Sequence, residues 1–406
     1  MEKIVVTGMG AVTPVGIGVD TYWKNITSSV SGIDTIKSFD TSDLAVQIAG
    51  EIKNFVPSDY LPKDLIRKTD PFMQYAYIAA EEAIKQSNID IVPERTGITM
   101  GTAMSGIATT AFTQDALSGA SHKKVGPRFI PKILGNIAAA NISINYNIQG
   151  PSFTISTACS SGGDAINMAC MCIQSGKADV MIAVGAESVL CPLVIYSLAN
   201  AKSLSRRNDT PKTASRPFDI TRDGFVIGEG GGALVIETEA HALARGAKIY
   251  AEIKSCGNTS DAYHVTAPHP EGRGAIACMK QALSDAKLSP SDIGYINAHG
   301  TATNKGDAVE IEAIKNIFTD KLPFVSSTKG ATGHMMGAGG ITETIACIKT
   351  IETGIIPPTI NLNEVGPECS GVDLVANTAK KAEINYAMSN AFGFGGQNSS
   401  VIVGKY

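Results

Sequence analysis

One local pattern occurs twice in this chain, and it restricts the fold more than any other feature of the sequence. Each copy consists of an apolar segment predicted to be a strand, a turn of small residues, a pair of glycines and an apolar helix. The glycine pairs are Gly162-Gly163 in the first copy and Gly339-Gly340 in the second. Strand and helix patterns alternate in both halves, which predicts α/β layers. The chain is therefore expected to be a duplication.

The first copy has a cysteine at its turn. Cys159 follows the apolar residues Phe153 and Ile155, and apolar residues at helical spacing follow it over 165–173. The partial positive charge at a helix N-terminus favours thiolate, and thiolate is a nucleophile in acyl transfer. The alternative is a small buried cysteine without reactivity, which is common for free cysteines. This segment alone leaves both interpretations open.

Two histidines occupy similar places in the second half of the chain. His299 ends the apolar segment 295–298 and precedes a turn of glycine and threonine, whereas His334 follows Phe324-Val325 and precedes a helical stretch over 341–351. Ligands and catalytic groups gather at the carboxyl ends of strands in α/β sheets. Either histidine alone can be a hydrogen-bonded structural residue. Together with Cys159, they predict a catalytic site.

A glycine-rich segment near the C-terminus adds a fourth component. Residues 389–398 read SNAFGFGGQN. Glycines at this density allow positive φ angles and close approach of the backbone. Such a loop can direct amide groups toward a developing oxyanion, although a tight structural turn is an equally good explanation of this segment by itself.

These segments together resemble the β-ketoacyl-acyl-carrier-protein synthases, which are condensing enzymes of the thiolase-fold superfamily. The resemblance extends from IVVTGMG at residues 4–10 to GFGG at residues 393–396. It implies a five-layered αβαβα fold of two duplicated halves, which we place at residues 1–245 and 246–406, with an insertion near 101–135. The Cys-His-His set is similar to that of decarboxylating elongation synthases of type II, whereas Cys-His-Asn would indicate the starter enzyme.

The resemblance also implies a reaction and a role for each site residue. Cys159 carries the acyl chain, and His299 and His334 donate to the malonyl thioester oxygen where enolate charge develops. The amides of Cys159 and Phe394 stabilise the oxyanion at the acyl carbonyl. Lys329 holds charge near His334, although a purely structural ion pair is an alternative. A buried lysine needs a carboxylate partner. The resemblance implies that Glu310 is this partner of Lys329, with Asp307 and Glu343 as further candidates.

The expected substrates and partners follow from the same family. Substrates arrive on the phosphopantetheine arm of an acidic acyl carrier protein, so neither a separate cofactor nor a metal is expected. Residues expected near the pantetheine or acyl chain are Thr301, Thr303, Met104, Phe392, Gly393 and Gly395. Met104 stands where the family usually has isoleucine at the acyl pocket. The basic residues expected to receive the carrier protein are Arg67, Lys68, Lys123, Lys124 and Arg207.

Composition agrees with an enzyme of the cytoplasm. The 406 residues are 44% hydrophobic and carry a net charge of −4, which is too small to indicate a nucleic-acid partner. The eight cysteines form no CxxC pair, so neither a disulfide framework nor a zinc site is indicated. No apolar stretch reaches the ~18 residues that a membrane span requires.

Several functions remain open at this stage. A synthase of fatty-acid elongation and a ketosynthase subunit of a type II polyketide or polyene system both fit the motifs. The expected assembly is either a homodimer or a heterodimer with a homologous chain-length subunit. Enzymes of the second kind often form such a heterodimer with a homologue that lacks the cysteine. A non-catalytic chain-length partner is disfavoured because Cys159, His299 and His334 are all present. A biosynthetic thiolase is disfavoured by the second histidine and by the segment around Lys329.

Overall fold

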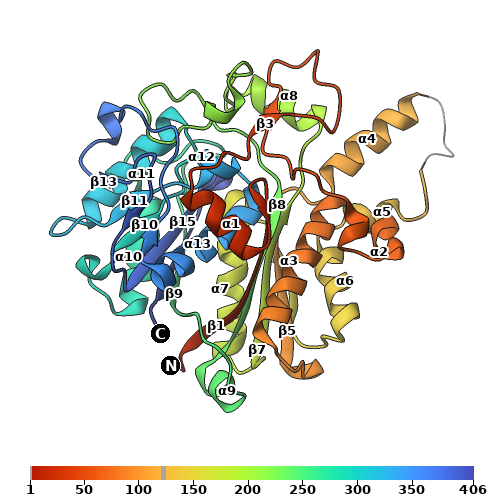
Figure 1. Ribbon diagram of the computed structural model, residues 1–406, viewed down its shortest axis with the longest axis horizontal. Coiled ribbons are helices and arrows are strands. Elements are labelled where there is room, and N and C mark those ends of the chain that lie inside the picture. The colour runs from red at the N-terminus through yellow and green to blue at the C-terminus, as the bar shows by residue number, and fades with distance from the viewer. Residues whose placement is uncertain (1, 120–124) are drawn as a thin grey trace.

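The first half of the chain contributes five main strands to a mixed sheet, which is continuous with the sheet of the second half (Figure 1). The computed structural model describes residues 2–119 and 125–406. In the order β6-β5-β7-β8-β1, the central strand pairs run parallel from β6 to β7 and antiparallel from β7 to β1. The strands are β1 (Ile4–Thr13), β5 (Thr96–Gly101), β6 (Ser152–Ile155), β7 (Val180–Glu187) and β8 (Gly230–Thr238).

The second half repeats this arrangement strand for strand. Its order is β11-β10-β15-β16-β9, with parallel pairing from β11 to β15 and antiparallel pairing from β15 to β9. The strands are β9 (Ala251–Ser260), β10 (Tyr295–Asn297), β11 (Phe324–Ser326), β15 (Tyr386–Gly393) and β16 (Gln397–Gly404). The expected duplication is therefore confirmed. The placement of the boundary at 245/246 stays a prediction.

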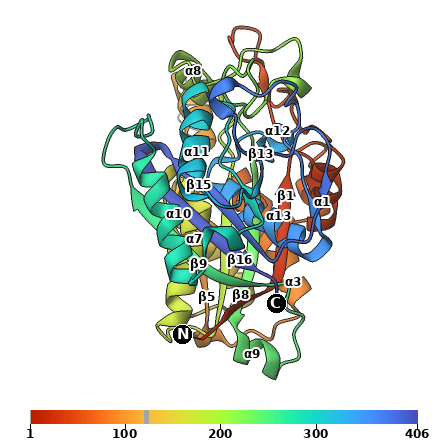
Figure 2. The same cartoon turned by 90° about the vertical axis from the view of Figure 1, so that its left-hand side faces the viewer.

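Helices cover both faces of each sheet. α7 (Ser161–Gln174) and α13 (Gly339–Thr353) lie between the two sheets, since α7 contacts both β7 and β9 and α13 contacts both β8 and β15. On the outside, α3 (Pro71–Ser87) packs against β1 and β8, and α10 (Arg273–Ala286) packs against β9 and β16 (Figure 2). The result is the five-layered αβαβα arrangement. Strands covered on both faces read as continuous apolar runs, and all eight residues of β7 are buried.

The two glycine pairs have a direct packing reason. A Cβ atom on Gly162 would lie 2.7 Å from the carbonyl oxygen of Gly337, and one on Gly340 would lie 2.5 Å from the amide nitrogen of Gly163. Only glycine allows the beginnings of α7 and α13 to approach this closely. The duplicated pattern therefore brings the two turns that carry Cys159 and His334 into contact.

The remaining elements extend the two sheets and cover their ends. β1 and β9 pair over Ile4–Val6, which joins the two sheets at one end. The region expected to be an insertion contains α4 (Ile107–Ser118), which projects from the body in Figure 1, and α5 (Phe129–Ile133). The other helices are α1 (Val19–Thr27), α2 (Lys63–Lys68), α6 (Asn136–Tyr146), α8 (Pro192–Asn200), α9 (Glu239–Ala244), α11 (Asn304–Ile317) and α12 (Lys329–Thr332). The short strands are β2 (Gly16–Ile17), β3 (Asp34–Thr35), β4 (Ile48–Ala49), β12 (Ile355–Ile356), β13 (Asp373–Leu374) and β14 (Lys380–Lys381). Among residues 2–119 and 125–406, no helix is both long and apolar enough to cross a membrane.

Candidate active site

Four segments that are far apart in the sequence meet at one cavity of 560 Å³. Cys159 lies in a short 3₁₀ turn (Ala158–Ser160) directly before α7, His299 follows β10, His334 follows α12, and Phe394 lies in the turn between β15 and β16. All four residues line the cavity. The candidates expected from the sequence therefore form a single site, but His334 lies after the short helix α12 and not at the end of β11, where it was expected.

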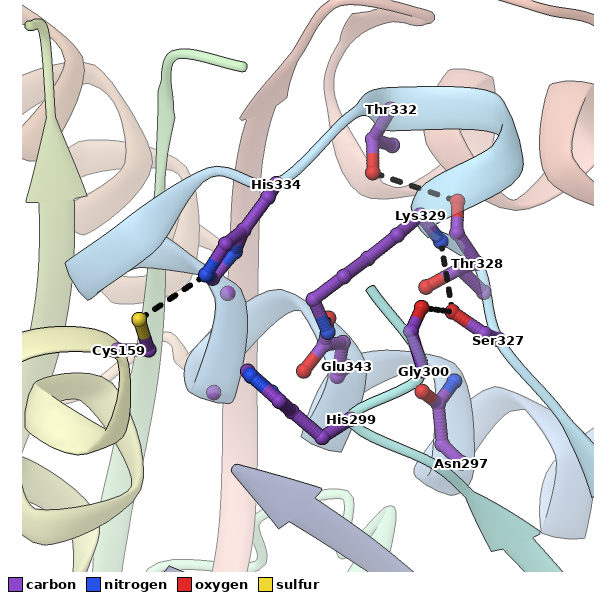
Figure 3. Close-up of polar contacts among 12 residues, drawn as sticks. Cys159, Asn297, His299, Gly300, Ser327, Thr328, Lys329, Thr332, His334 and Glu343 are labelled. Atoms are coloured by element: carbon purple, nitrogen blue, oxygen red, sulfur yellow. Dashed lines mark hydrogen bonds and ion pairs between the residues drawn. The ribbon is translucent and has the colours of Figure 1, made fainter. Parts of the chain in front are cut away.

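The sulfur and the two imidazoles are in direct proximity (Figure 3). The Sγ atom of Cys159 is 3.0 Å from Nε2 of His334. The rings of His299 and His334 have centroids 5.2 Å apart and stand nearly perpendicular, at 85°. Cys159 and His334 are buried, and His299 is partly buried. A substrate carbonyl that reaches the sulfur therefore also meets both imidazoles.

The turn before Cys159 is strained. Ala158 has a φ of +51°, a conformation that residues with a Cβ rarely adopt. The buried Asp164 side chain stabilises the turn from below, because it accepts hydrogen bonds from Thr157 Oγ1 at 2.5 Å and from Ser160 Oγ at 3.1 Å. Its other oxygen accepts from Nδ2 of Asn258 in the second half of the chain, at 2.7 Å. Neither the strain at Ala158 nor the role of Asp164 was identified from the sequence. No local sequence pattern distinguishes these two residues from an ordinary alanine and an ordinary aspartate.

The expected thiolate character of Cys159 is contradicted by its depth. Burial raises the pKa of the thiol to about 11, and this effect outweighs the amide of Phe394, the charge of Lys329 and its own amide, which all lower the pKa. Glu187 raises the pKa further. The resting group is therefore the neutral thiol, because the loss of solvent outweighs the contacts that favour the thiolate.

Two backbone amides face the sulfur, as expected for an oxyanion site. They belong to Phe394 and to Cys159 itself. Gly393 makes this approach possible, since a Cβ there would lie 3.1 Å from the nitrogen of Cys159 and 2.9 Å from the carbonyl oxygen of Thr157. Gly395 has a φ of +83°, so the turn itself requires glycine.

Both imidazoles are neutral at physiological pH. Burial lowers the pKa of His299 and of His334 well below the ordinary value, and the nearby charge of Lys329 lowers both further. The backbone amide of Met336 donates to Nδ1 of His334 at 3.4 Å, so the proton of that ring is assigned to Nε2. His334 therefore presents an N–H toward the sulfur. Among the described residues, Nδ1 of His299 has no hydrogen-bond partner.

The carboxylate that pairs with Lys329 is not Glu310, which was the first one expected. Lys329 Nζ pairs with Glu343 of α13, and both side chains are almost fully buried (Figure 3). Glu310 instead accepts from the backbone amides of His299 and Gly300, both at 2.8 Å. Glu343 is therefore the correct candidate, and Glu310 holds the His299 loop in place.

Asp307 supports the next part of the same loop. Its carboxylate accepts from the amide of Ala302 at 3.1 Å and from that of Phe218 at 2.8 Å. A completely buried guanidinium, that of Arg222, lies 3.5 Å away. The expectation that Asp307 pairs with Lys329 is therefore wrong. Burial raises the pKa of Asp307 to about 6.

Most residues expected to contact the pantetheine or acyl chain do line the cavity. These are Thr301, Thr303, Met104, Phe392 and Gly393, whereas Gly395 shapes the turn. The hydroxyls of Thr301 and Thr303 are 3.1 Å apart. Two basic residues of the lining, Lys202 and Lys305, were not identified from the sequence, where they are indistinguishable from solvated lysines.

The residues expected to bind the carrier protein are only partly described. Arg67 and Lys68 are exposed on α2, and both pair with Asp64 of the same helix, which reduces their net charge. Arg207 is about one-third exposed and lies 3.6 Å from Asp223. Lys123 and Lys124 lie outside the described residues, so their part in docking stays a prediction.

The catalytic set has the donor types of a zinc site but an unfavourable charge. One donor atom from each of Cys159, His299 and His334 lies within 4.8 Å of the others, and thiolate and imidazole are common zinc ligands. However, the charge of Lys329 acts on all three groups and opposes a cation there. The absence of a metal cofactor stays a prediction.

Comparison with known proteins agrees with this geometry. The profile described as "Beta-ketoacyl synthase, N-terminal domain" matches residues 1–242, and "Beta-ketoacyl synthase, C-terminal domain" matches residues 250–363. The chain belongs to the β-ketoacyl synthase family. The expected fold family is therefore confirmed. The expected enzyme class, an acyltransferase that acts as a ketosynthase, is confirmed as well.

Individual relatives of this β-ketoacyl synthase include proteins of two kinds. It is 42% identical to "3-oxoacyl-[acyl-carrier-protein] synthase 2" of Staphylococcus aureus (strain COL), over 100% of this chain and 99% of the relative. It is 31% identical to the solved "ishigamide ketosynthase/chain length factor", with a TM-score of 0.93 over 100% and 99% of the two chains. A third similar structure is described as a type II PKS acyl-carrier protein in complex with its ketosynthase bound to the hexaketide. That match has 30% identity and a TM-score of 0.90, and it covers 100% of this chain and 99% of the other.

Proposed function

We propose that this β-ketoacyl synthase joins an acyl chain on Cys159 to malonyl-acyl-carrier protein by decarboxylative condensation, and that the product is 3-oxoacyl-acyl-carrier protein. The observation that carries the proposal is the position of the Cys159 sulfur. It lies 3.0 Å from the Nε2–H of His334 and faces the amides of Cys159 and Phe394. Donors are therefore present at both places where negative charge develops in the reaction.

The first step transfers the acyl chain. The sulfur of Cys159 attacks the thioester carbonyl of the acyl-carrier protein, and the amides of Cys159 and Phe394 stabilise the tetrahedral oxyanion. The bond between the carbonyl carbon and the pantetheine sulfur then breaks, and the departing sulfur takes the proton that the cysteine thiol loses. The products are an acyl thioester on Cys159 and a carrier protein with a free thiol.

The second step forms the new carbon–carbon bond. Malonyl thioester loses carbon dioxide, and the electron pair of the broken bond becomes an enolate whose oxygen accepts from His299 and His334. Because both imidazoles are neutral, each carries one N–H that it can donate to this oxygen. The enolate carbon attacks the acyl carbonyl on Cys159, the bond between that carbon and the sulfur of Cys159 breaks, and the departing thiolate takes a proton from solvent water.

Fatty-acid elongation is the pathway that we propose first. The 42% identity to 3-oxoacyl-[acyl-carrier-protein] synthase 2 exceeds the 30–31% identity to the polyketide ketosynthases. A type II polyketide or polyene ketosynthase is the second candidate, supported by the 30% identity and the TM-score of 0.90 to the ketosynthase that was solved in complex with a type II PKS acyl-carrier protein. The proposed partners are an acyl carrier protein and either a second copy of this chain or a homologous chain-length subunit, and the proposed location is the cytoplasm.

One experiment tests the reaction. The purified protein is incubated with acyl-carrier proteins loaded with acyl chains of increasing length, and the intact mass is measured before and after malonyl-carrier protein is added. We expect a mass increase equal to the acyl group, located on Cys159 by peptide mapping, which disappears when malonyl-carrier protein is added. Acylation of the Cys159→Ala protein at another residue would contradict the assignment.

The same preparation distinguishes the two pathways. Native mass spectrometry of the purified chain is expected to show a homodimer that condenses saturated acyl chains without another subunit. A monomer that becomes active only with a cysteine-less homologue would favour the polyketide system instead.

A further inference from the structure

A buried carboxylate at the end of β7 connects two turns of the cavity wall. Glu187 is completely buried. One oxygen accepts from Thr102 Oγ1 and from the amide of Met104, both at 3.1 Å. The other accepts from the amide of Ala103 at 2.6 Å and from that of Gly337 at 3.2 Å. One side chain therefore connects the β5–α4 turn to the turn that follows His334.

Both of these turns are strained, and each contributes a methionine to the cavity. Ser105 has a φ of +51° and Met336 a φ of +46°, so each turn has a left-handed residue with a Cβ. Such conformations persist only where the surrounding structure holds them. Met104 and Met336 both line the cavity together with Cys159. The hydrogen bonds of Glu187 are therefore suited to fix the position of both methionines.

The connection depends on a carboxylate that accepts hydrogen bonds at both oxygens. A glutamine has one oxygen and one NH₂ group, so in either orientation its NH₂ group would face two of these four donors and could accept from neither. Gly337 also matters here, because a Cβ at that position would lie 2.9 Å from Oε2 of Glu187. The carboxylate and the glycine together allow the two turns to share one acceptor.

We infer that Glu187 is a positioning residue that sets the spacing between Met104 and Met336 and thereby selects acyl chains by length. This inference rests on the proposed function, since it assumes that the acyl chain on Cys159 passes along this wall. Met336 packs in the same apolar cluster as Cys159, together with Val194 of α8. Methionine side chains are flexible and adapt to the molecule that occupies the cavity. The width of the cavity between Met104 and Met336 is therefore set by the position of the backbone that carries them.

The test compares Glu187→Gln with Glu229→Gln. Glu229 is also a buried carboxylate, and it accepts from the amide of Ile52 at 3.0 Å and from Ser188 Oγ at 2.8 Å. Neither of those partners lines the cavity. The measurement is kcat/KM for acylation of Cys159 by carrier proteins that bear short, intermediate and long straight chains.

We expect Glu187→Gln to change the ratio of kcat/KM between the longest and shortest chains by about tenfold or more, which is within the discrimination that apolar pockets achieve. Glu229→Gln should leave this ratio unchanged. Iodoacetamide carries no acyl chain, so its reaction does not depend on the spacing of the two methionines. Its labelling of Cys159 should proceed in Glu187→Gln at least as fast as in the wild type. An equal loss for every chain length, as expected of general destabilisation, would overturn the inference.

A second variant covers the case in which Glu187→Gln does not fold. Thr102→Val keeps the carboxylate but removes one of its donors and also the acceptor of the Ser105 amide at 3.2 Å. It should shift the same ratio in the same direction by a smaller factor, and an unchanged ratio would overturn the inference. If the wild type acylates Cys159 from no carrier protein, the proposed function fails and the inference fails with it. If the wild type acylates but the ratio does not change, only the inference fails.

Discussion

The buried pair of Lys329 and Glu343 leads to a prediction that separates stability from activity. The side chains are 2% and 4% exposed, so neither charge has an alternative partner in bulk solvent. The change to make is Glu343→Gln, which leaves the lysine charge buried and without its carboxylate. The matched change is the double variant Lys329→Met with Glu343→Leu, which removes both charges and keeps the approximate volume.

The expected magnitudes are large for single substitutions. Removing one partner of a buried pair typically costs about 3–5 kcal/mol, whereas replacing both by apolar residues is often neutral or stabilising by about 1–4 kcal/mol. An unfolding entropy of roughly 2.1 cal/mol/K per residue over 406 residues gives about 0.85 kcal/mol/K. The single variant should therefore lose about 4–6 °C in Tm, and the double variant should have a Tm at or above that of the wild type.

The assay combines thermal unfolding by calorimetry with release of labelled carbon dioxide from malonyl-carrier protein. The double variant should be stable and still impaired in decarboxylation, because the charge of Lys329 acts on both histidines. If the double variant decarboxylated at the wild-type rate, the pair would be structural only. If Glu343→Gln had the Tm of the wild type, the lysine would not depend on this carboxylate.

Three further predictions concern the nucleophile, the histidines and the packing of the halves. His299→Ala and His334→Ala should each still accept an acyl group on Cys159 but should lower carbon dioxide release by ~10²–10³, the usual effect of losing one oxyanion donor; decarboxylation at the wild-type rate without acylation would refute this division of roles. Because the pKa of the Cys159 thiol is raised to about 11, the thiolate fraction increases with pH up to that value. Alkylation of Cys159 should therefore accelerate about tenfold per pH unit between neutral pH and pH ~10, and a rate that is constant across this interval, measured by mass spectrometry, would show a depressed pKa. Gly340→Ala should destabilise the protein by about 1–3 kcal/mol, because its Cβ would lie 2.5 Å from the backbone nitrogen of Gly163; an unchanged denaturation midpoint would show that α7 and α13 are not held in this contact.

Local patterns in the sequence were sufficient for the duplicated architecture and for the principal catalytic candidates. The apolar spacing over 165–173 and 341–351 predicted helices that the structure places within α7 and α13. Cys159 follows β6 and a turn of small residues, and His299 comes two residues after the end of β10. Positions after the carboxyl ends of parallel strands lie at one edge of a sheet. The spacing of apolar residues and the composition of turns are properties of residues that are close in the sequence. They can therefore be interpreted without knowledge of the fold.

Contacts between distant segments were decided only by the tertiary structure. Lys329 pairs with Glu343 and not with Glu310, which accepts from the amides of His299 and Gly300. The strain at Ala158 and the carboxylate of Asp164 beneath it were likewise absent from any local pattern. The choice among equivalent carboxylates depends on which donor lies within hydrogen-bond distance after packing, and residue spacing does not contain that information.

The charge state of the nucleophile shows the same limit. The sequence correctly placed Cys159 near the beginning of a helix, where the dipole favours thiolate, but burial raises the pKa of the thiol to about 11. The helix contributes a local electrostatic effect that can be inferred from a few residues. Desolvation depends on every atom that replaces water around the sulfur, and those atoms come from both halves of the chain. The sequence by itself therefore determined which group is the nucleophile, and only the folded protein determined its protonation state.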